Sequence, residues 1–578
     1  MKLKITPRRA GALAGLVGCL LSTACRQSPP PPAPAPPTAR HVVLLNQGWS
    51  EREARFYDHA NEGTNLAPVE FLLNLPDPAK PGSKFVDKLS NDYGFIPSEK
   101  SAANPHGLPV GFAIDDRPAG FGDRVYVGMT CSACHSRQLT YSKAEAGGQT
   151  TTWILPVYGG PGLVDFQRFN RDFYDAIFAL LENDTLAREF AQGVLGRAPG
   201  ADDLVALRNE IREFSEPVAV TRSILSDWKI PAADFGPGNL NALSQGNYNN
   251  IGLFAWLTKK GLVPPSTDPP ARPHFEGSVN LPPMWFAPTD TWAQWFAEIH
   301  DPGPRNWVQS VSTSAVRPPK MTAALKGAVV LASIHFDNIA EIQHSLELLR
   351  TPKWPEAVFG SLDRAKVDAG RALYEEHCAR CHTRTVLPPN SLGIVFKERP
   401  AFDVGTDPTA YQEFAGGAAS RVAGLKRLSE SILGMRQAQL AAKFGQDAAA
   451  NYMKLYSRGR PNEYALAKDD YKDAKDANWP KTGAAYWASP LEGIFASSPY
   501  FHNGSVRTLW DVLTPPLQRP KTFRTGSNAF DVAGVGLSSD GSFVYDTAEP
   551  GKGSGGHAFG TDLAQDRKAA LIEYLKSL

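Results

Sequence analysis

Two copies of one short pattern, Cys-x-x-Cys-His, carry the strongest chemical signal in this sequence. Their members are Cys131, Cys134 and His135 in the first copy, and Cys378, Cys381 and His382 in the second. Two thiols one helical turn apart can add to the two vinyl groups of one haem, and the following histidine then lies under the iron as its proximal ligand. With six cysteines and 12 histidines in 578 residues, a chance copy is expected about 0.001 times. The sequence therefore predicts two covalently bound haem c groups.

Other chemistries of paired cysteines fit this pattern less well. A redox dithiol or half of a zinc site does not need a histidine directly after the second cysteine, and here that histidine occurs twice. The sequence contains no nucleophile elbow, HExxH motif or P-loop. Several common classes of enzyme are thereby excluded.

The sixth ligand of each iron decides what each haem can do. An iron with two strong protein ligands transfers electrons but has no position for oxygen, whereas an open iron can do chemistry. Candidates for the sixth ligand of the second haem are His502, His557, Met435 and Met453. No second ligand stands out near the first haem, where the candidates are Met129, His106 and His300. We therefore expect the first iron to be the open one.

Aromatic residues gather in one segment between the two motifs. Four of the 12 tryptophans lie within 23 residues, at Trp285, Trp292, Trp295 and Trp307, joined by Phe286 and Phe296. They could line an apolar pocket at the reaction centre, or they could form a plain aromatic core. Glu298 and His300 lie in the same segment and could serve as the distal acid or base that peroxide cleavage usually needs.

The composition is that of a folded protein without a nucleic-acid footprint. Apolar residues make up 42% and charged residues 21%, which excludes a wholly disordered chain. The first 24 residues hold four of the 60 basic residues and no acidic one, so the rest of the chain has 56 basic and 59 acidic residues. Nucleic-acid binding needs a clear basic excess, so it is not expected.

The N-terminus predicts export and a lipid anchor. Residues 1–24 read as a lipoprotein signal peptide, with a basic start, an apolar stretch and small residues before Cys25, the predicted lipidation site. Cys19 is the alternative site, and ordinary secretory cleavage without a lipid is the alternative process. Residues 25–40 form a proline-rich tether. No later segment has about 20 continuous apolar residues, so no transmembrane helix is expected.

The haem motifs lie far apart, which places them in different lobes. We expect an N-terminal haem lobe at 41–350 and a C-terminal lobe at 351–578 that resembles a class I cytochrome c. The fold class is mainly α with extensive irregular loops, since strand signals are sparse. Expected helices of the first lobe span 164–181 and 202–214.

The C-terminal lobe has two helical signals and an insertion. Asp363 can cap a helix that runs into the second motif, with Val367, Gly370, Leu373 and Tyr374 on one face. Leu571, Tyr574, Leu575 and Leu578 are spaced as in an amphipathic terminal helix. A helical insertion is expected around 418–456.

Several segments resemble the rubber-oxygenase-like branch of the bacterial di-haem cytochrome c peroxidase and MauG superfamily. They are Gln47-Gly48-Trp49, Glu62-Gly63-Thr64, Val127-Gly128-Met129-Thr130, Gly159-Gly160-Pro161 with Asp165-Phe166, Leu281-Pro282-Pro283-Met284-Trp285, Trp354-Pro355-Glu356, Ser498-Pro499-Tyr500-Phe501-His502-Asn503-Gly504-Ser505 and Gly556-His557. They run from about residue 46 to the C-terminus. The haem motifs occur in many cytochromes, but the order of these segments is more specific.

The resemblance implies roles for individual residues. In peroxidase relatives the histidine equivalent to His502 lies near a haem propionate, while the late Gly-His pair of this branch supplies a distal ligand. His557 is therefore the expected sixth ligand of the second haem, with His502 as the alternative. A tryptophan of the aromatic segment is expected to carry electrons between the haems, as in relatives.

The resemblance also implies a function. Members of this branch are periplasmic or secreted two-haem proteins, and some oxygenate carbon–carbon double bonds of polyisoprene or unsaturated fatty acids with O₂. We expect a dioxygenase acting on an apolar olefin at the first haem. The alternatives are a peroxidase that uses H₂O₂ or a MauG-like oxidase, and a non-enzymatic electron carrier.

Partners, further cofactors and location follow from the same resemblance. A small cytochrome or cupredoxin is a candidate electron donor, and a calcium ion between the two lobes is a candidate cofactor that the sequence does not decide. The expected location is the periplasm, on a lipid anchor in the outer membrane, with secretion as the alternative.

Overall fold

The computed structural model describes residues 38–115, 124–145, 148–229, 234–241, 276–290, 334–386, 397–416 and 486–578, with single residues and short stretches between 256 and 450. The predicted signal peptide, Cys25 and most of the predicted tether lie outside these ranges, as do Glu298, Phe296, Met435 and Met453. In the described part of the chain, no helix combines the length and apolar character that crossing a membrane requires.

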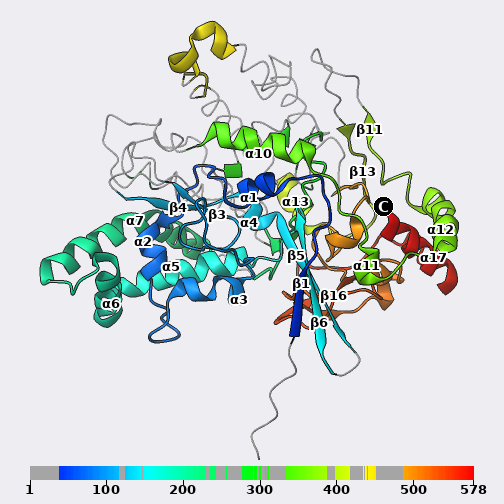
Figure 1. The fold of residues 1–578 in the computed structure, drawn as a ribbon, viewed down its shortest axis with the longest axis horizontal. Helices are drawn as coiled ribbons and strands as arrows, with labels where there is room; N and C mark the ends of the chain where they lie inside the picture. The colour runs from blue at the N-terminus through cyan, green and yellow to red at the C-terminus, as the bar shows by residue number, and fades with distance from the viewer. Residues whose placement is uncertain are drawn as a thin grey trace, which may run out of the picture.

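The N-terminal half is built on helices packed around a phenylalanine-rich core (Figure 1). Its helices are α1 (Glu51–His59), α2 (Val69–Asn74), η1 (Phe85–Lys88), α3 (Leu89–Tyr93), α5 (Phe166–Glu182), α6 (Asp184–Leu195) and α7 (Ala201–Asp227). The helix expected at 164–181 is confirmed as α5. The helix expected at 202–214 is longer in the structure. α7 continues through Pro217 to Asp227, although proline has no N–H to bond within a helix.

Strands contribute more than the sequence suggests. β5 (Ser136–Ala144) and β6 (Thr150–Tyr158) form a long antiparallel hairpin, and β1 (Thr38–Val42) pairs with β6 in parallel. A second sheet has the order β2 (Ala67–Pro68), β4 (Tyr126–Met129) and β3 (Phe112–Asp115). The fold is therefore helical with sheets and loops, and the expectation of few strands was wrong for residues 136–158.

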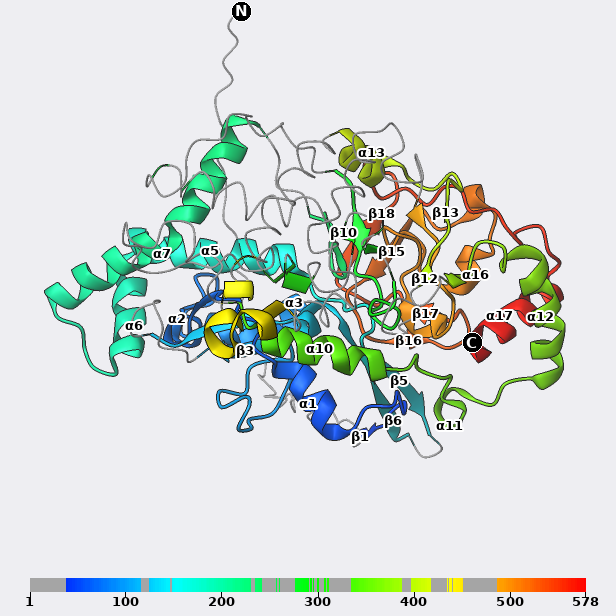
Figure 2. The same cartoon turned by 90° about the horizontal axis from the view of Figure 1, so that it is seen from above.

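Two long helices cross in the C-terminal part, where they lie side by side in Figures 1 and 2. They are α12 (Arg364–His377) and α17 (Gln565–Ser577), as the sequence predicts. Asp363 caps α12, with its side chain accepting from the Lys366 N–H at 3.2 Å. A Cβ at Gly370 would lie 2.0 Å from the carbonyl oxygen of Ala570, so only glycine permits this close crossing.

The remaining elements are short, apart from α10 with 13 residues. The helices are α4 (Cys131–Cys134), α10 (Phe336–Leu348), α11 (Glu356–Phe359), α13 (Thr409–Gly416), η4 (Ile494–Ser497), α16 (Leu509–Val512) and η5 (Pro516–Gln518). The strand pairs are β7 (Asn239–Leu240) with β8 (Val279–Asn280), β9 (Trp292–Ala293) with β10 (Ile299–His300), β11 (Thr385–Val386) with β12 (Lys397–Glu398), β13 (Ala401–Phe402) with β14 (Tyr486–Trp487), β15 (Thr522–Thr525) with β18 (Phe543–Asp546), and β16 (Phe530–Asp531) with β17 (Gly536–Leu537). The described residues within 434–450 of the expected helical insertion are mostly helical, and the rest of that insertion lies outside the described residues.

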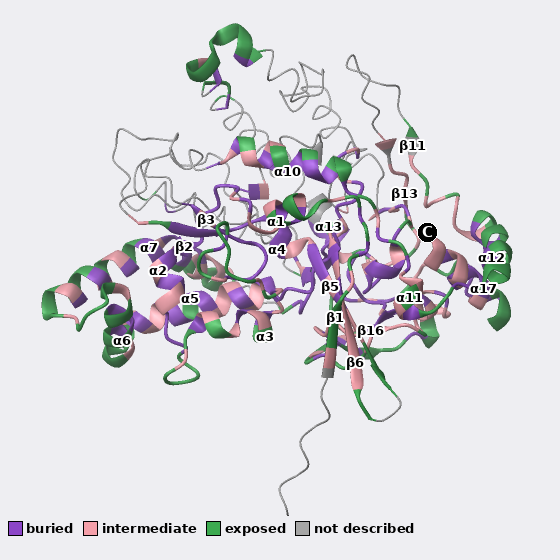
Figure 3. Ribbon diagram, in the orientation of Figure 1, coloured by how far each residue is buried: buried purple, intermediate pink, exposed green. Residues whose placement is uncertain are grey.

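One hydrophobic core joins the two halves of the chain. It contains Leu139 and Leu155 of the β5–β6 hairpin together with Phe495 and Leu571 of the C-terminal part. The backbone N–H of Thr140 donates to the carbonyl of Asn528 at 2.8 Å. Figure 3 shows buried residues gathered at this junction and exposed residues on the outer faces of α6 and α12. The strand that follows the first haem motif is thus held by residues of the second half.

Candidate functional site

The first Cys-x-x-Cys-His motif forms one helical turn at the end of a buried strand. β4 leads into α4, and the Thr130 side chain caps this turn by accepting from the Ser132 N–H at 3.3 Å. The His135 N–H donates to the Cys131 carbonyl at 2.9 Å, which closes the turn and places both thiols one turn apart. The local sequence therefore produces the geometry that attachment to one haem needs.

A backbone carbonyl fixes the His135 ring. Its Nδ1 lies 2.9 Å from the carbonyl oxygen of Pro282, so Nδ1 carries the proton and Nε2 is available as a metal ligand. Burial lowers the pKa of His135 to about 4, which keeps the imidazole neutral, the form that binds iron. Sequence reasoning did not identify the role of Pro282, because a carbonyl acceptor has no residue-type signal.

Glu62 and Tyr57 hold the same turn from α1 and the loop after it. The Glu62 carboxylate accepts from the Cys131 N–H at 2.6 Å and from the Ser310 hydroxyl at 3.1 Å. Burial raises the pKa of Glu62. The Tyr57 hydroxyl donates to the His135 carbonyl at 3.1 Å. Sequence analysis assigned neither residue to the site.

The second motif repeats the arrangement of the first. α12 runs up to Cys378, and the His382 N–H donates to the Cys378 carbonyl at 3.1 Å. The His382 Nδ1 lies 2.7 Å from the carbonyl oxygen of Ser489. Burial lowers the pKa of His382. Both motif histidines are therefore neutral rings, and each is oriented by a carbonyl far away in the sequence.

His557 lies opposite His382. The centroids of the two rings are 6.3 Å apart, and their planes are inclined by 60°. Metal–imidazole bonds of about 2.0 Å on opposite sides of one ion would place two such centroids roughly 6 Å apart. Burial is the main cause that lowers the pKa of His557 to about 4, and its Nδ1 is buried without a hydrogen-bond partner. These residues fit a haem held by two axial imidazoles.

His502 does not share this position. Its ring stacks on Tyr486 at 3.6 Å between centroids and meets the edge of Trp295 at 6.5 Å. Asn280 donates its backbone N–H to the His502 carbonyl at 2.6 Å. Burial lowers the pKa of His502 to about 3. The structure therefore brings together His382 and His557, and it places His502 among other aromatic rings.

Trp285 lies between the two halves of the chain. Its indole N–H donates to the Tyr158 carbonyl at 2.8 Å. A Cβ at Gly159 would be 3.2 Å from this indole, and a Cβ at Gly493 would be 3.1 Å from it. Both glycines also have positive φ angles. Trp285 comes three residues after Pro282 and contacts a turn four residues after Ser489, so it links the two loops whose carbonyls orient His135 and His382.

The other residues expected in the aromatic segment have different neighbours. The Trp295 indole donates to the Asn280 carbonyl at 3.0 Å, and buried Trp307 packs edge-on against Phe336 of α10. Trp292 and His300 are cross-strand partners of β9 and β10, but their side chains lie outside the described residues, as does all of Glu298. The described contacts therefore do not bring the tryptophans together as the lining of one apolar pocket.

The remaining candidates for a sixth ligand are distributed as follows. Met129 is fully buried in β4, in the helical core of the N-terminal half. His106 is exposed, which is unlike an axial ligand of a buried haem. Met435 and Met453 lie outside the described residues.

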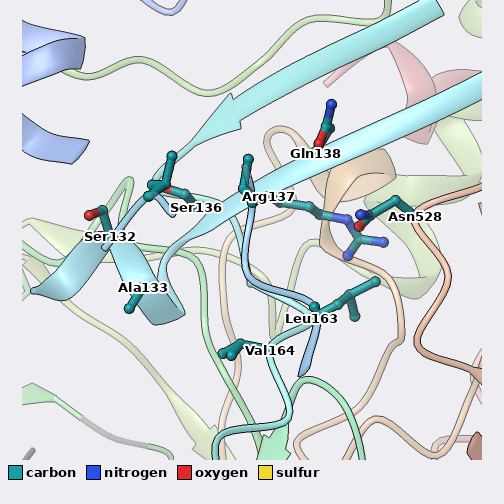
Figure 4. Close-up of a pocket in the computed structure, with 11 residues that line it drawn as sticks. Ser132, Ala133, Ser136, Arg137, Gln138, Leu163, Val164 and Asn528 are labelled. Atoms are coloured by element: carbon teal, nitrogen blue, oxygen red, sulfur yellow. The ribbon is translucent and has the colours of Figure 1, made fainter. Parts of the chain in front are cut away.

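A buried arginine lies two residues after the histidine of the first motif. Arg137 is 1% exposed, and its guanidinium donates to the carbonyl of Ser498. Burial lowers the pKa of Arg137 to about 10. Figure 4 shows its side chain beside a narrow hollow that Ser132, Ser136 and Asn528 also line. Sequence analysis did not single out Arg137, because a buried arginine cannot be told from an exposed one by type.

Comparisons with known proteins identify relatives of the chain. An uncharacterized protein of Sinorhizobium fredii, y4iJ, is 30% identical over 94% of this chain and 94% of its own length. The chain belongs to the y4iJ family. A second uncharacterized protein of that organism, y4iM, is 24% identical over 59% of this chain and 75% of its own length.

Two further matches connect this chain with cytochromes. A family model described as RoxA-like, cytochrome c-like matches residues 485–524. Cytochrome c1 2, a mitochondrial heme protein of Arabidopsis thaliana, is 32% identical over 83 residues, which are 14% of this chain and 27% of that protein. These matches support a C-terminal cytochrome c-like domain and haem c as a cofactor. The segment 485–524 contains Ser489, which orients His382, and His502.

Proposed function

We propose that this chain is a di-haem c-type oxidoreductase with one haem for chemistry and one for electron transfer. The observation that carries the proposal is an asymmetry between the two motifs. His557 faces His382 at 6.3 Å between ring centroids. Among the residues that the structure describes, no aromatic or imidazole ring faces His135 in this way. The second haem would therefore be closed by two imidazoles, and the first would be open.

The protein contributes ligation, orientation and exclusion of water. An open haem supplies a coordination position for O₂ or peroxide chemistry, whereas a haem with two axial imidazoles supplies electron transfer alone. The Pro282 and Ser489 carbonyls hold the protons of His135 and His382 at Nδ1. Trp285, which contacts both supporting loops, is proposed to mediate electron transfer between the haems.

For the reaction, we propose dioxygenation of an apolar olefin, such as an unsaturated fatty acid or a polyisoprene. Both atoms of O₂ enter the product, so the overall reaction consumes no external reductant. The RoxA-like match at 485–524 supports this choice. Buried Trp285, Phe286 and Trp307 provide apolar surface in the segment expected near the reaction centre.

Location and partners are part of the same proposal. Cytochrome c maturation outside the cytoplasmic membrane agrees with the export signal in residues 1–24. A lipid on Cys25 and the proline-rich tether would keep the enzyme at the outer membrane, where apolar chains partition. We propose a small cytochrome or cupredoxin as the partner that sets the redox state of the second haem.

The experiment that tests the reaction is incubation of the purified holoprotein with ¹⁸O₂ and either oleate or polyisoprene, without added peroxide. We expect two ¹⁸O atoms in the product by mass spectrometry. The double variant Cys131→Ser, Cys134→Ser, which lacks the first attachment site, should give no labelled product. Absence of label with both substrates, together with rapid H₂O₂ reduction, would show a peroxidase instead.

A further inference from the structure

Arg519 is a buried arginine that binds the loop carrying His557. It is 3% exposed. Its Nη1 donates to the carbonyls of Ser554 at 2.6 Å and Gly556 at 2.8 Å, and its Nη2 donates to the carbonyl of His557 itself at 2.9 Å. Three hydrogen bonds from one guanidinium therefore hold the backbone of the Gly-His pair and of Ser554 just before it.

The same guanidinium is anchored on its other side. Its Nε donates to the carbonyls of Asp511 at 3.2 Å and Thr514 at 3.1 Å, and its Nη2 also donates to the carbonyl of Val512 at 3.2 Å. Asp511 and Val512 form the C-terminal end of α16, and Thr514 follows that helix. Arg519 thus ties the His557 loop to a short helix that contacts α17.

The His557 loop has a backbone conformation that needs external support. Gly556 has φ +65° and His557 has φ +47°, and a non-glycine residue in the left-handed region is unfavourable unless its surroundings hold it there. The opposite side of the loop has one backbone hydrogen bond, from the His557 N–H to the Val404 carbonyl at 2.8 Å. Arg519 supplies most of the hydrogen bonds that fix this turn.

A ring contact adds to the backbone contacts. The Arg519 guanidinium lies 5.0 Å from the centroid of the Phe501 ring, and that ring lies 5.4 Å from the His557 ring. Among the ion pairs of the described residues, none includes Arg519. The guanidinium therefore lies against carbonyl dipoles of both segments and against the Phe501 ring, which is a neighbour of His557.

We propose that Arg519 is the positioning residue that holds His557 in place as an axial ligand of the second haem. This inference rests on the ligation by two imidazoles proposed above. The planar guanidinium spans the two sets of carbonyls with a fork of donors. Lysine has a single nitrogen, so it can keep the charge but cannot make the bridge.

The test compares four variants of the full-length holoprotein, Arg519→Met, Arg519→Lys, His557→Ala and Arg507→Met. Arg507 is a matched control, since it is a partly buried arginine of the same part of the chain that donates to the Leu537 carbonyl and not to the His557 loop. Haem content, electron paramagnetic resonance of the ferric protein and the rate of cyanide binding are measured for each. The resonance spectrum reports axial ligation directly and is independent of catalytic activity.

His557→Ala should lose one low-spin species. In Arg519→Met and Arg519→Lys, part of that species should convert to high spin, and cyanide should bind the second haem at least about tenfold faster, as expected when hydrogen bonds from a charged donor are lost. Free imidazole should restore the low-spin signal, and Arg507→Met should resemble the wild type. If Arg519→Met does not fold, Arg519→Lys decides.

Two results would overturn the inference, and they differ in what they say of the proposed ligation. If both Arg519 variants keep the wild-type spectrum and cyanide rate while His557→Ala loses the low-spin species, Arg519 does not position the ligand and the ligation stands. If His557→Ala leaves the spectrum unchanged, the ligation fails and the inference fails with it.

Discussion

Arg137 donates a hydrogen bond to the carbonyl of Ser498, although the two residues are 361 positions apart in the chain. Arg137 comes two residues after the histidine of the first motif, and Ser498 lies in the segment that matches the RoxA-like family model. This contact and the shared hydrophobic core mean that neither half of the protein completes its packing alone.

The Arg137 contact predicts a loss of stability on substitution. Arg137→Met removes the donor and leaves the Ser498 carbonyl and hydroxyl buried without it, which should cost about 1–3 kcal/mol. Guanidinium unfolding followed by circular dichroism measures the change. Arg524→Met is the control, since exposed Arg524 lies on the surface and its loss should cost less than about 0.5 kcal/mol. Equal effects of the two substitutions would refute the role of Arg137.

The proposed covalent attachment of two haems leads to a fixed stoichiometry. The wild type should keep two haems per chain after acid-acetone extraction, and Cys378→Ser with Cys381→Ser should keep one, because thioether bonds survive denaturation. Pyridine haemochrome absorbance against protein concentration measures the ratio. A wild-type ratio near one would contradict this prediction.

The two candidate axial histidines can be separated by comparing His557→Ala and His502→Ala. Loss of an axial imidazole converts a low-spin iron to a high-spin or water-ligated one. Electron paramagnetic resonance should therefore lose one low-spin species in His557→Ala and keep both in His502→Ala, whose native ring stacks on Tyr486. The reverse pattern would assign the ligand to His502.

The crossing of α12 and α17 predicts a strict requirement for glycine. Gly370→Ala would place a methyl group 2.0 Å from the Ala570 carbonyl oxygen, so the helices must separate. We expect a loss of about 1–3 kcal/mol in the free energy of unfolding. The matched control is Gly434→Ala, where the added methyl group meets no atom within 4 Å and the helical position should favour alanine. Thermal unfolding of both variants tests the prediction.

The lowered pKa of buried His502 predicts that the stability of the protein depends on pH. Burial lowers its pKa from 6.5 to about 3 in the folded protein, so between these values the unfolded chain binds a proton that the folded chain does not. Stability should therefore fall as pH falls through this window, with a slope of up to about 1.4 kcal/mol per pH unit from this residue.

The measurement is denaturant unfolding at pH 7, 5.5 and 4.5. His502→Phe should reduce the loss of stability between the highest and lowest pH. His106→Phe replaces an exposed histidine and should leave that loss at its wild-type size. An unchanged loss in His502→Phe would contradict the prediction.

The sequence alone predicts the local features of this protein. Each Cys-x-x-Cys-His turn depends on five consecutive residues. The helix that ends at the second motif depends on a cap at Asp363 and a repeating apolar face. α12, α17 and α5 were predicted because each is specified by a short periodic pattern. The β5–β6 hairpin was missed because residues 136–158 mix polar and apolar positions, and burial against the second half of the chain stabilises them.

Only the tertiary structure decides which distant groups meet. His382 and His557 are separated by 175 positions, and residue type favoured His502 as much as His557 for the same place. The carbonyls of Pro282 and Ser489, and the carbonyls that Arg519 binds, have no signature in sequence, since every residue has a carbonyl group. A haem ligand is defined by the direction of a ring nitrogen, and that direction follows from long-range packing rather than from neighbours along the chain.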